Sequence, residues 1–166
     1  MGTRSSAPIH LASEVRIVTF PETRVAAITH IGPPALEHQT VGRLIQWKLE
    51  HRLLDPARYR TYGIHYTDPR TTPSAQHRVD FCLSIEAGVD GNALGIVETT
   101  IPANRCALAR DIGSRHDNRT AVWLYEDWLP RSGERAGGYP IFFHYVNVGP
   151  GLRAEELITD VYLPLA

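Results

Sequence analysis

The fold is decided by two stretches of the sequence, PETRVAAITHIGP at residues 21–33 and PANRCALARDIGS at residues 102–114. When the second is placed under the first at an offset of 81 residues, five positions carry the same proline, arginine, alanine, isoleucine and glycine. The same offset pairs Trp47 with Trp128 farther along the chain. A collinear series of matches at a fixed offset indicates an internal duplication.

Each of the two units has the pattern strand, strand, helix, strand, strand. In the first unit, VRIVTF (15–20) and RVAAITHI (24–31) are short and rich in β-branched residues, as strands are. Gly32 and the two prolines after it end the second strand and open a helix. Apolar residues at spacings of three and four predict one buried face on this helix: Val41, Leu44, Ile45, Leu49 and Leu53.

The remaining elements complete an α+β domain. Strands are predicted near 59–67, 77–85, 96–101, 105–112, 140–148 and 156–165, and a second helix near 119–129, stopped by the proline that follows it. Short strands separated by tight turns favour antiparallel pairing, with both helices on one face of the sheet. We therefore expect a single domain at 14–166, made of repeat one (14–85), a Gly-rich linker (86–95) and repeat two (96–166), after a disordered N-terminal tail at 1–13.

Composition excludes several classes of protein. The net charge is −1, which gives no general positive field for direct nucleic-acid binding. No apolar run is long enough to span a membrane, and residues 1–13 lack the apolar block of a signal peptide, so we expect a cytoplasmic protein without a membrane partner. Cys82 and Cys106 belong to no CxxC motif and are expected to be small buried thiols.

The usual catalytic motifs do not occur in the chain. The sequence contains no GxSxG, HExxH, GxxxxGK[ST] or GxGxxG pattern. Its histidines lie on different predicted elements without the spacing of metal ligands. We therefore expect no metal, no cofactor and no catalytic residue assigned by motif.

Aromatic residues on two strands suggest where a ligand would bind. Alternation places Tyr62, Ile64 and Tyr66 on one face of their strand, and Phe143 and Tyr145 together on one face of the equivalent strand. Such faces could line an apolar cleft between the halves, suited to stacking with a flat ligand. Core packing is the alternative for each of these side chains. The candidate ligand-binding residues are Tyr62, Ile64, Tyr66, Trp123, Phe143 and Tyr145.

A set of motifs, taken in order, resembles a known family. They are RVAAITHIGP (24–33), GIHYTDP (63–69), HRVDFCLSI (77–85), RCALARDIG (105–113), TAVWLYEDWLPRSG (120–133), YPIFFHYVN (139–147) and LITDVYLPL (157–165). Together they resemble the gyrase-inhibitor-like (GyrI-like) small-molecule-binding domain, which is related to the effector-binding domains of drug-sensing transcription regulators. The resemblance covers about residues 14–166. It implies duplicated ββαββ units, an eight-stranded antiparallel sheet, two helices and a central cleft on a pseudo-twofold axis.

One position departs from the family pattern. The resemblance implies a buried Glu in a motif like Pro-x-Phe-Glu-x-Tyr, but this chain has Phe143 at the Glu position. A carboxylate there would attract a cationic ligand or serve the hydrolytic members, whereas a phenyl ring offers only its face. The substitution therefore favours a non-enzymatic role and weakens the case for selection of cations by charge.

The leading hypothesis is binding of a hydrophobic or aromatic small molecule in the central cleft by a stand-alone sequestering or sensing module. A first alternative is a protein-interaction role that modulates DNA gyrase. A second is hydrolysis of small reactive electrophiles, for which the candidate acids on strands are Asp80, Asp160 and Glu98.

Overall fold

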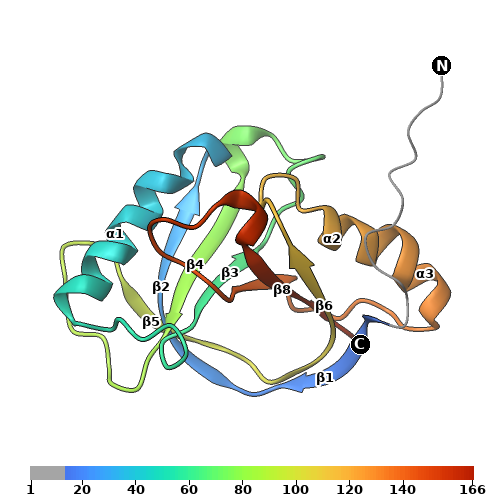
Figure 1. The fold of residues 1–166 in the computed structure, drawn as a ribbon, viewed down its shortest axis with the longest axis horizontal. Helices are drawn as coiled ribbons and strands as arrows, with labels where there is room; N and C mark the ends of the chain where they lie inside the picture. Colours follow the sequence, from blue (N-terminus) through green and yellow to red (C-terminus); the bar gives the residue numbers. More distant parts are fainter. Residues whose placement is uncertain (1–13) are drawn as a thin grey trace.

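The computed structural model describes residues 14–166, so the predicted tail at 1–13 lies outside the described residues. The strands are β1 (Arg16–Phe20), β2 (Thr23–Ile31), β3 (Thr61–His65), β4 (Arg78–Ser84), β5 (Val97–Ile101), β6 (Asn104–Ile112), β7 (Phe142–Tyr145) and β8 (Ile158–Pro164). The helices are α1 (Glu37–Glu50) and a second helix built from α2 (Arg119–Trp123), the π-helical segment η4 (Leu124–Trp128) and α3 (Leu129–Ser132). Figure 1 shows α1 and the second helix on opposite sides of the molecule, with β3, β4 and β8 between them.

The eight strands form one sheet in the order β1-β6-β8-β7-β3-β4-β2-β5, and every neighbouring pair is antiparallel. This confirms the predicted α+β fold. The order is symmetric about the central pair β7 and β3, and each half lends its first strand to the other, since β1 pairs with β6 and β5 pairs with β2. The segment 86–95 contains no strand or helix and connects β4 to β5. The repeat boundaries, and the duplication itself, stay predictions.

Helix α1 buries a face rotated from the one its apolar residues predict. The buried residues are Thr40, Leu44 and Trp47, whereas Ile45 and Leu49 are 48% and 57% exposed. The Trp47 indole packs with Leu44 against β2 and β4, and Thr40 is tied to the sheet by a 2.7 Å hydrogen bond to His30 Nδ1. The packing of Trp47 and the hydrogen bond of Thr40 thus set the rotation of the helix, and Ile45 and Leu49 are left exposed.

The second helix runs farther than the sequence predicts. It passes through Pro130 and ends at Ser132, where Gly133 adopts φ +77°, a conformation that favours glycine. Pro130 lacks an N–H, but it lies in the first turn of α3, directly after the π-helical segment, and proline is tolerated in a first helical turn. Within residues 14–166, neither helix is long and apolar enough to cross a membrane.

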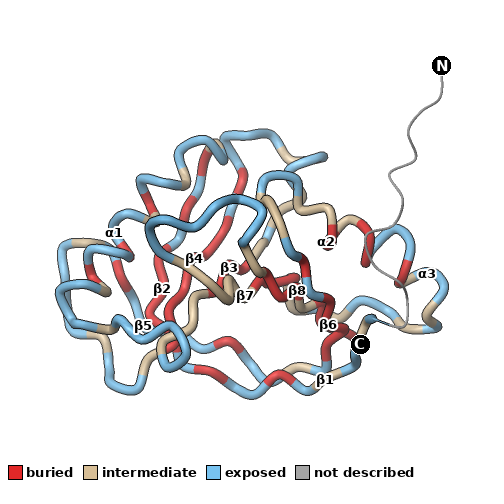
Figure 2. The backbone as a smooth tube through the Cα atoms, viewed as in Figure 1, coloured by how far each residue is buried: buried red, intermediate tan, exposed pale blue. Residues whose placement is uncertain are grey.

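The sheet curls into a half-barrel whose inside is filled by its own side chains. The rings of Phe20 on β1 and Tyr62 on β3 lie 5.8 Å apart, although three strands separate them in the sheet. We call this group the interior cluster: Phe20, Val25, Ala27, Tyr62, Ile64, Cys82, Ile101, Cys106 and Phe142. It contains both cysteines, which are free and buried as expected. Figure 2 shows buried backbone along the central strands and exposed backbone in the outer loops.

Candidate functional site: a cleft between the two helices

Two adjoining cavities lie on the helix-bearing face of the sheet. The first has a volume of about 490 Å³ and the second about 560 Å³. Both have in their walls His65, Pro69, Asn118, Ala121 and Phe143. Because they have these walls in common, we treat them as one cleft with two lobes. It lies over the central strands β3 and β7, where the symmetric strand order places the middle of the sheet.

The register between β3 and β7 sets which side chains form the cleft floor. Gly63 lies opposite Phe143, and Thr61 lies opposite Tyr145, so these four positions face the same side of the sheet. Gly63 is needed there, because a Cβ on it would lie 2.5 Å from the Tyr145 hydroxyl oxygen. The His65 ring packs against Phe143 with centroids 4.4 Å apart. The floor is therefore an aromatic surface made by both halves of the chain.

Two of the candidate residues lie on the other face of the sheet. Tyr62 and Ile64 pair with His144 and Phe142, and with Phe142 they belong to the interior cluster. Strand alternation correctly grouped Tyr62 with Ile64. Their side chains, however, point into the half-barrel interior, whereas Phe143 lies on the opposite face of the sheet. The structure therefore does not bring these two residues to the cleft.

The other candidates are divided as well. Phe143 and Tyr145 border the first lobe. Tyr66 borders the second lobe, and its hydroxyl donates a 3.1 Å hydrogen bond to Asp80, which borders neither lobe. Trp123 borders neither lobe and is buried in the core beneath the second helix. A binding role remains a prediction for Phe143, Tyr145 and Tyr66.

Arg115 forms one wall of the first lobe. Its Nε donates to Thr159 Oγ1 at 2.7 Å, and its Nη2 donates to the carbonyl oxygens of Ile158 and Asn147 at 2.7 and 3.1 Å. The guanidinium lies 4.9 Å from the centre of the Tyr145 ring. Among the described residues Nη1 donates no hydrogen bond. Burial lowers the pKa of this arginine, since the charged form loses water.

The carboxylates of the first lobe are hydrogen-bonded to other side chains. Glu37 at the start of α1 accepts a 2.7 Å hydrogen bond from His77 Nε2. Asp111 at the end of β6 receives Arg119 Nε at 3.1 Å. Arg115 forms no ion pair with a carboxylate within the described part of the chain, so no side chain neutralises its charge by direct contact.

His65 is a buried polar group at the base of both lobes. Its Nε2 is inaccessible to solvent and has no hydrogen-bond partner among residues 14–166. Burial, together with the nearby His77, lowers the pKa of His65 to about 4, so the ring is neutral at pH 7. Alternation along β3 placed His65 opposite to Tyr62, but only the register with β7 shows that its face is the cleft face. No motif in the sequence pointed to Arg115, which follows β6 in a loop.

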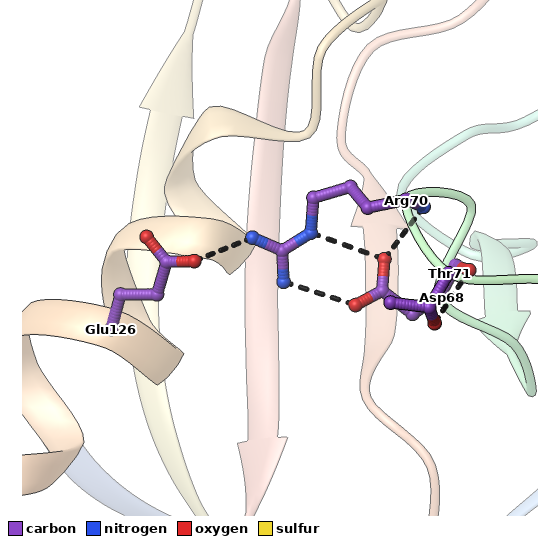
Figure 3. A network of polar contacts seen from close by, with 4 residues as sticks. All are labelled: Asp68, Arg70, Thr71 and Glu126. Carbon is purple, nitrogen blue, oxygen red and sulfur yellow. Dashed lines mark hydrogen bonds and ion pairs between the residues drawn. The ribbon is translucent and has the colours of Figure 1, made fainter.

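A polar network joins the two walls of the second lobe (Figure 3). Arg70, in the loop between β3 and β4, donates through Nε and Nη2 to Asp68 at 3.1 and 3.0 Å. Its Nη1 reaches Glu126 of the second helix at 2.6 Å. Both Asp68 and Arg70 border the second lobe, and Glu126 follows Tyr125, which borders it from the helix side. The network therefore links the halves at the edge of the cleft.

The three strand carboxylates proposed for hydrolysis lie outside both lobes. Each accepts hydrogen bonds elsewhere on the sheet: Asp80 from Thr29 and Tyr66, Asp160 from Arg110, and Glu98 from Arg24. Phe143, at the position where the family pattern has Glu, is 5% exposed and packs on His65. The geometry thus gives no support for acid chemistry by these carboxylates.

Comparisons with known proteins agree with the fold. The chain is 35% identical to "Probable transcriptional regulator YgiV" of Escherichia coli K12, over 95% of this chain and 99% of that protein. It is 30% identical to a "DNA gyrase inhibitor" of Edwardsiella ictaluri, over 92% of this chain and 97% of that protein. The crystal structure of the EcmrR C-terminal domain superposes with a TM-score of 0.71 at 16% identity, covering 92% of this chain and 96% of that chain.

The family comparison covers nearly the whole chain. Residues 13–166 match the family described as "GyrI-like small molecule binding domain". This range contains both helices and all eight strands of the sheet, including the strands that form the cleft floor. The resemblance drawn from the ordered motifs is confirmed, and the chain belongs to the GyrI-like small-molecule-binding domain family.

Proposed function

We propose that this protein binds a hydrophobic or aromatic small molecule in the cleft between its two helices, as a sequestering or sensing module. The observation that carries the proposal is the aromatic floor of Phe143, His65 and Tyr145, which is bordered by two adjoining cavities. Each lobe falls within the range of roughly 300–1,000 Å³ that is usual for small-molecule sites. Membership of a small-molecule-binding family supports the same function.

The aromatic floor also indicates how a ligand would be held. The rings of Phe143 and Tyr145 are perpendicular to each other, with centroids 6.4 Å apart, and form an edge-to-face pair in the floor. A flat ligand in the cleft would remove the apolar parts of its walls from water, a gain of about 25 cal/mol for each Å² removed from water. Ala121 on α2, the small residue of the opposite wall, leaves space above this floor.

A thermal-shift screen of aromatic compounds tests the proposal. A ligand at one hundred times its dissociation constant adds about 2.7 kcal/mol of stability. For a domain of this size that raises Tm by roughly 5–10 °C. Signals of His65 and Tyr145 in NMR spectra should shift when such a ligand is added. If no compound raises Tm and none shifts these signals, the proposal is wrong.

Filling the cleft gives a matched test. Ala121→Phe places a ring in the space that both lobes share and should weaken binding at least tenfold. Ala87→Phe makes the same chemical change at an exposed position in the segment between β4 and β5, and should leave binding unchanged. Equal affinity in the Ala121→Phe variant would place the ligand outside the cleft.

A second candidate function is modulation of DNA gyrase. It is favoured by relatives that carry the name "DNA gyrase inhibitor", one of them 30% identical over 92% of this chain. It predicts that the purified protein forms a stable complex with gyrase and reduces supercoiling in vitro. Unchanged supercoiling, together with no complex in a pull-down, would exclude this function while leaving ligand binding intact.

A further inference from the structure

The wall of the first lobe includes an arginine side chain that is already held in position by the protein. Three arginines border the two lobes, and two of them are neutralised, Arg119 by Asp111 and Arg70 by Asp68 and Glu126. Only Arg115 among these three has no carboxylate partner within the described residues. Its charge is therefore available to a ligand.

The geometry of Arg115 is suited to an anion. Hydrogen bonds to Thr159, Ile158 and Asn147 fix two of its nitrogens, and the Tyr145 ring supports the plane of the guanidinium. Its Nη1 donates to no acceptor in the part of the chain that the structure describes, so an acidic group can bind there without ordering a mobile side chain. Such preorganisation reduces the entropy lost on binding, and charge-assisted hydrogen bonds are stronger than neutral ones.

The two carboxylates that border the first lobe have hydrogen-bond partners other than Arg115. Glu37 and Asp111 are engaged with His77 and Arg119. In the second lobe, Asp117 is exposed, and its carboxylate accepts a 3.3 Å hydrogen bond from the Arg119 amide. Water screens an exposed carboxylate far more than it screens the half-buried guanidinium.

The aromatic floor lies directly beside this cation. The Arg115 guanidinium lies over the ring of Tyr145, and Tyr145 contacts Phe143 edge to face. A planar ligand against this floor would therefore lie beside the Arg115 guanidinium. A cationic ligand in the same place would meet the positive charge with no carboxylate on the floor to offset it.

We propose that the ligand of this cleft is an aromatic compound bearing an acidic group, with its aromatic part against the floor formed by Phe143 and Tyr145 and its carboxylate or similar anion paired with Arg115. The inference rests on the proposed ligand-binding function and adds to it the chemical class of the ligand. Arg115 is the residue that selects an acid over a neutral or cationic compound of the same shape.

Calorimetric titration of the folded full chain with three probes tests the inference. The probes are 2-naphthoate, the neutral isostere 2-naphthamide and the lipophilic cation tetraphenylphosphonium. The wild-type protein should bind the acid at least tenfold more tightly than the amide, a difference of about 1.4 kcal/mol. A wild-type protein that binds the amide or the cation as tightly as the acid overturns the inference but leaves the proposed function standing. Binding of none of the three probes contradicts the proposed function itself.

Variants assign the preference to one side chain. Arg115→Met should lose the preference for the acid while its affinity for the amide changes less than threefold, which shows that the cleft is still formed. Arg115→Lys keeps a charge and should keep part of the preference. Arg131→Met removes an exposed arginine of α3 with the same change in net charge, and should leave all affinities unchanged. Circular dichroism shows whether Arg115→Met folds. If it folds and keeps the tenfold preference for the acid, Arg115 does not have the proposed role. If it does not fold, Arg115→Lys is the test, and an undiminished tenfold preference in that variant refutes the role of Arg115.

Discussion

The buried neutral His65 should make the protein less stable as the pH falls below about 6.5. Burial lowers the pKa of its ring to about 4 in the folded state, whereas an unfolded histidine has a pKa near 6.5. Between these two values the unfolded chain binds a proton that the folded chain does not. Protonation therefore favours unfolding, and the stability present above pH 6.5 is lost as the pH falls toward 4.

The size of the effect follows from the same two pKa values. Lowering the pH from 7 to 5 should reduce the free energy of unfolding by about 2 kcal/mol through His65 alone. Burial also lowers the pKa of His144, on the opposite face of the sheet, to about 4, so the total loss in the wild-type protein is larger. Below pH 4 both rings are protonated in either state, and their contribution to the slope ends.

Urea unfolding at the two pH values, followed by circular dichroism, measures the change. The variant His65→Gln cannot titrate, so its loss between pH 7 and pH 5 should be about 2 kcal/mol smaller than that of the wild type. His38→Gln removes an exposed histidine at the start of α1 and should behave like the wild type. A His65→Gln variant with the wild-type pH dependence would refute the claim that His65 is held neutral by burial.

Two further predictions concern the cleft. Gly63→Ala places a Cβ 2.5 Å from the Tyr145 hydroxyl oxygen, and overpacking of this kind should cost about 1–3 kcal/mol of unfolding free energy. Adding Tyr145→Phe should recover part of that loss, and a Gly63→Ala protein as stable as the wild type would contradict the contact. Arg70→Ala removes the network to Asp68 and Glu126, whose exposed ion pairs contribute less than about 1 kcal/mol. It should instead speed dissociation of a bound fluorescent ligand in stopped-flow measurements, and an unchanged dissociation rate would show that the network does not restrain the second lobe.

Local sequence patterns predicted the secondary structure well. Each expected strand is present, and β2 and β6, from the two stretches with matching residues, span Thr23–Ile31 and Asn104–Ile112. These elements are fixed by short-range preferences, namely β-branched runs, glycines at positive φ and prolines at turns. Gly32 and Gly113 show this directly, because both occur at a strand end with φ near +130°, at +135° and +131°. The rotation of α1 could not be predicted from such patterns, because it depends on how Trp47 packs against the sheet.

The cleft could be predicted only in part. Alternation along one strand shows that Tyr62 and Ile64 share a face and that Phe143 and Tyr145 share a face, but it does not show which face of one strand continues into which face of the next. A shift of one residue in the register exchanges the two faces. The observed register places Gly63, and not Tyr62 or Ile64, beside Phe143.

The sequence by itself determined the order of strands and helices, the family and the aromatic character of the two central strands. Only the tertiary structure decided that His65 joins Phe143 on the cleft floor, and that Arg115 stands in its wall without a carboxylate partner among the described residues. Arg115 is 30 residues before Tyr145 and 44 before Thr159. Secondary structure arises from neighbours along the chain, whereas a binding site is made by side chains that meet only after the sheet has paired and curled.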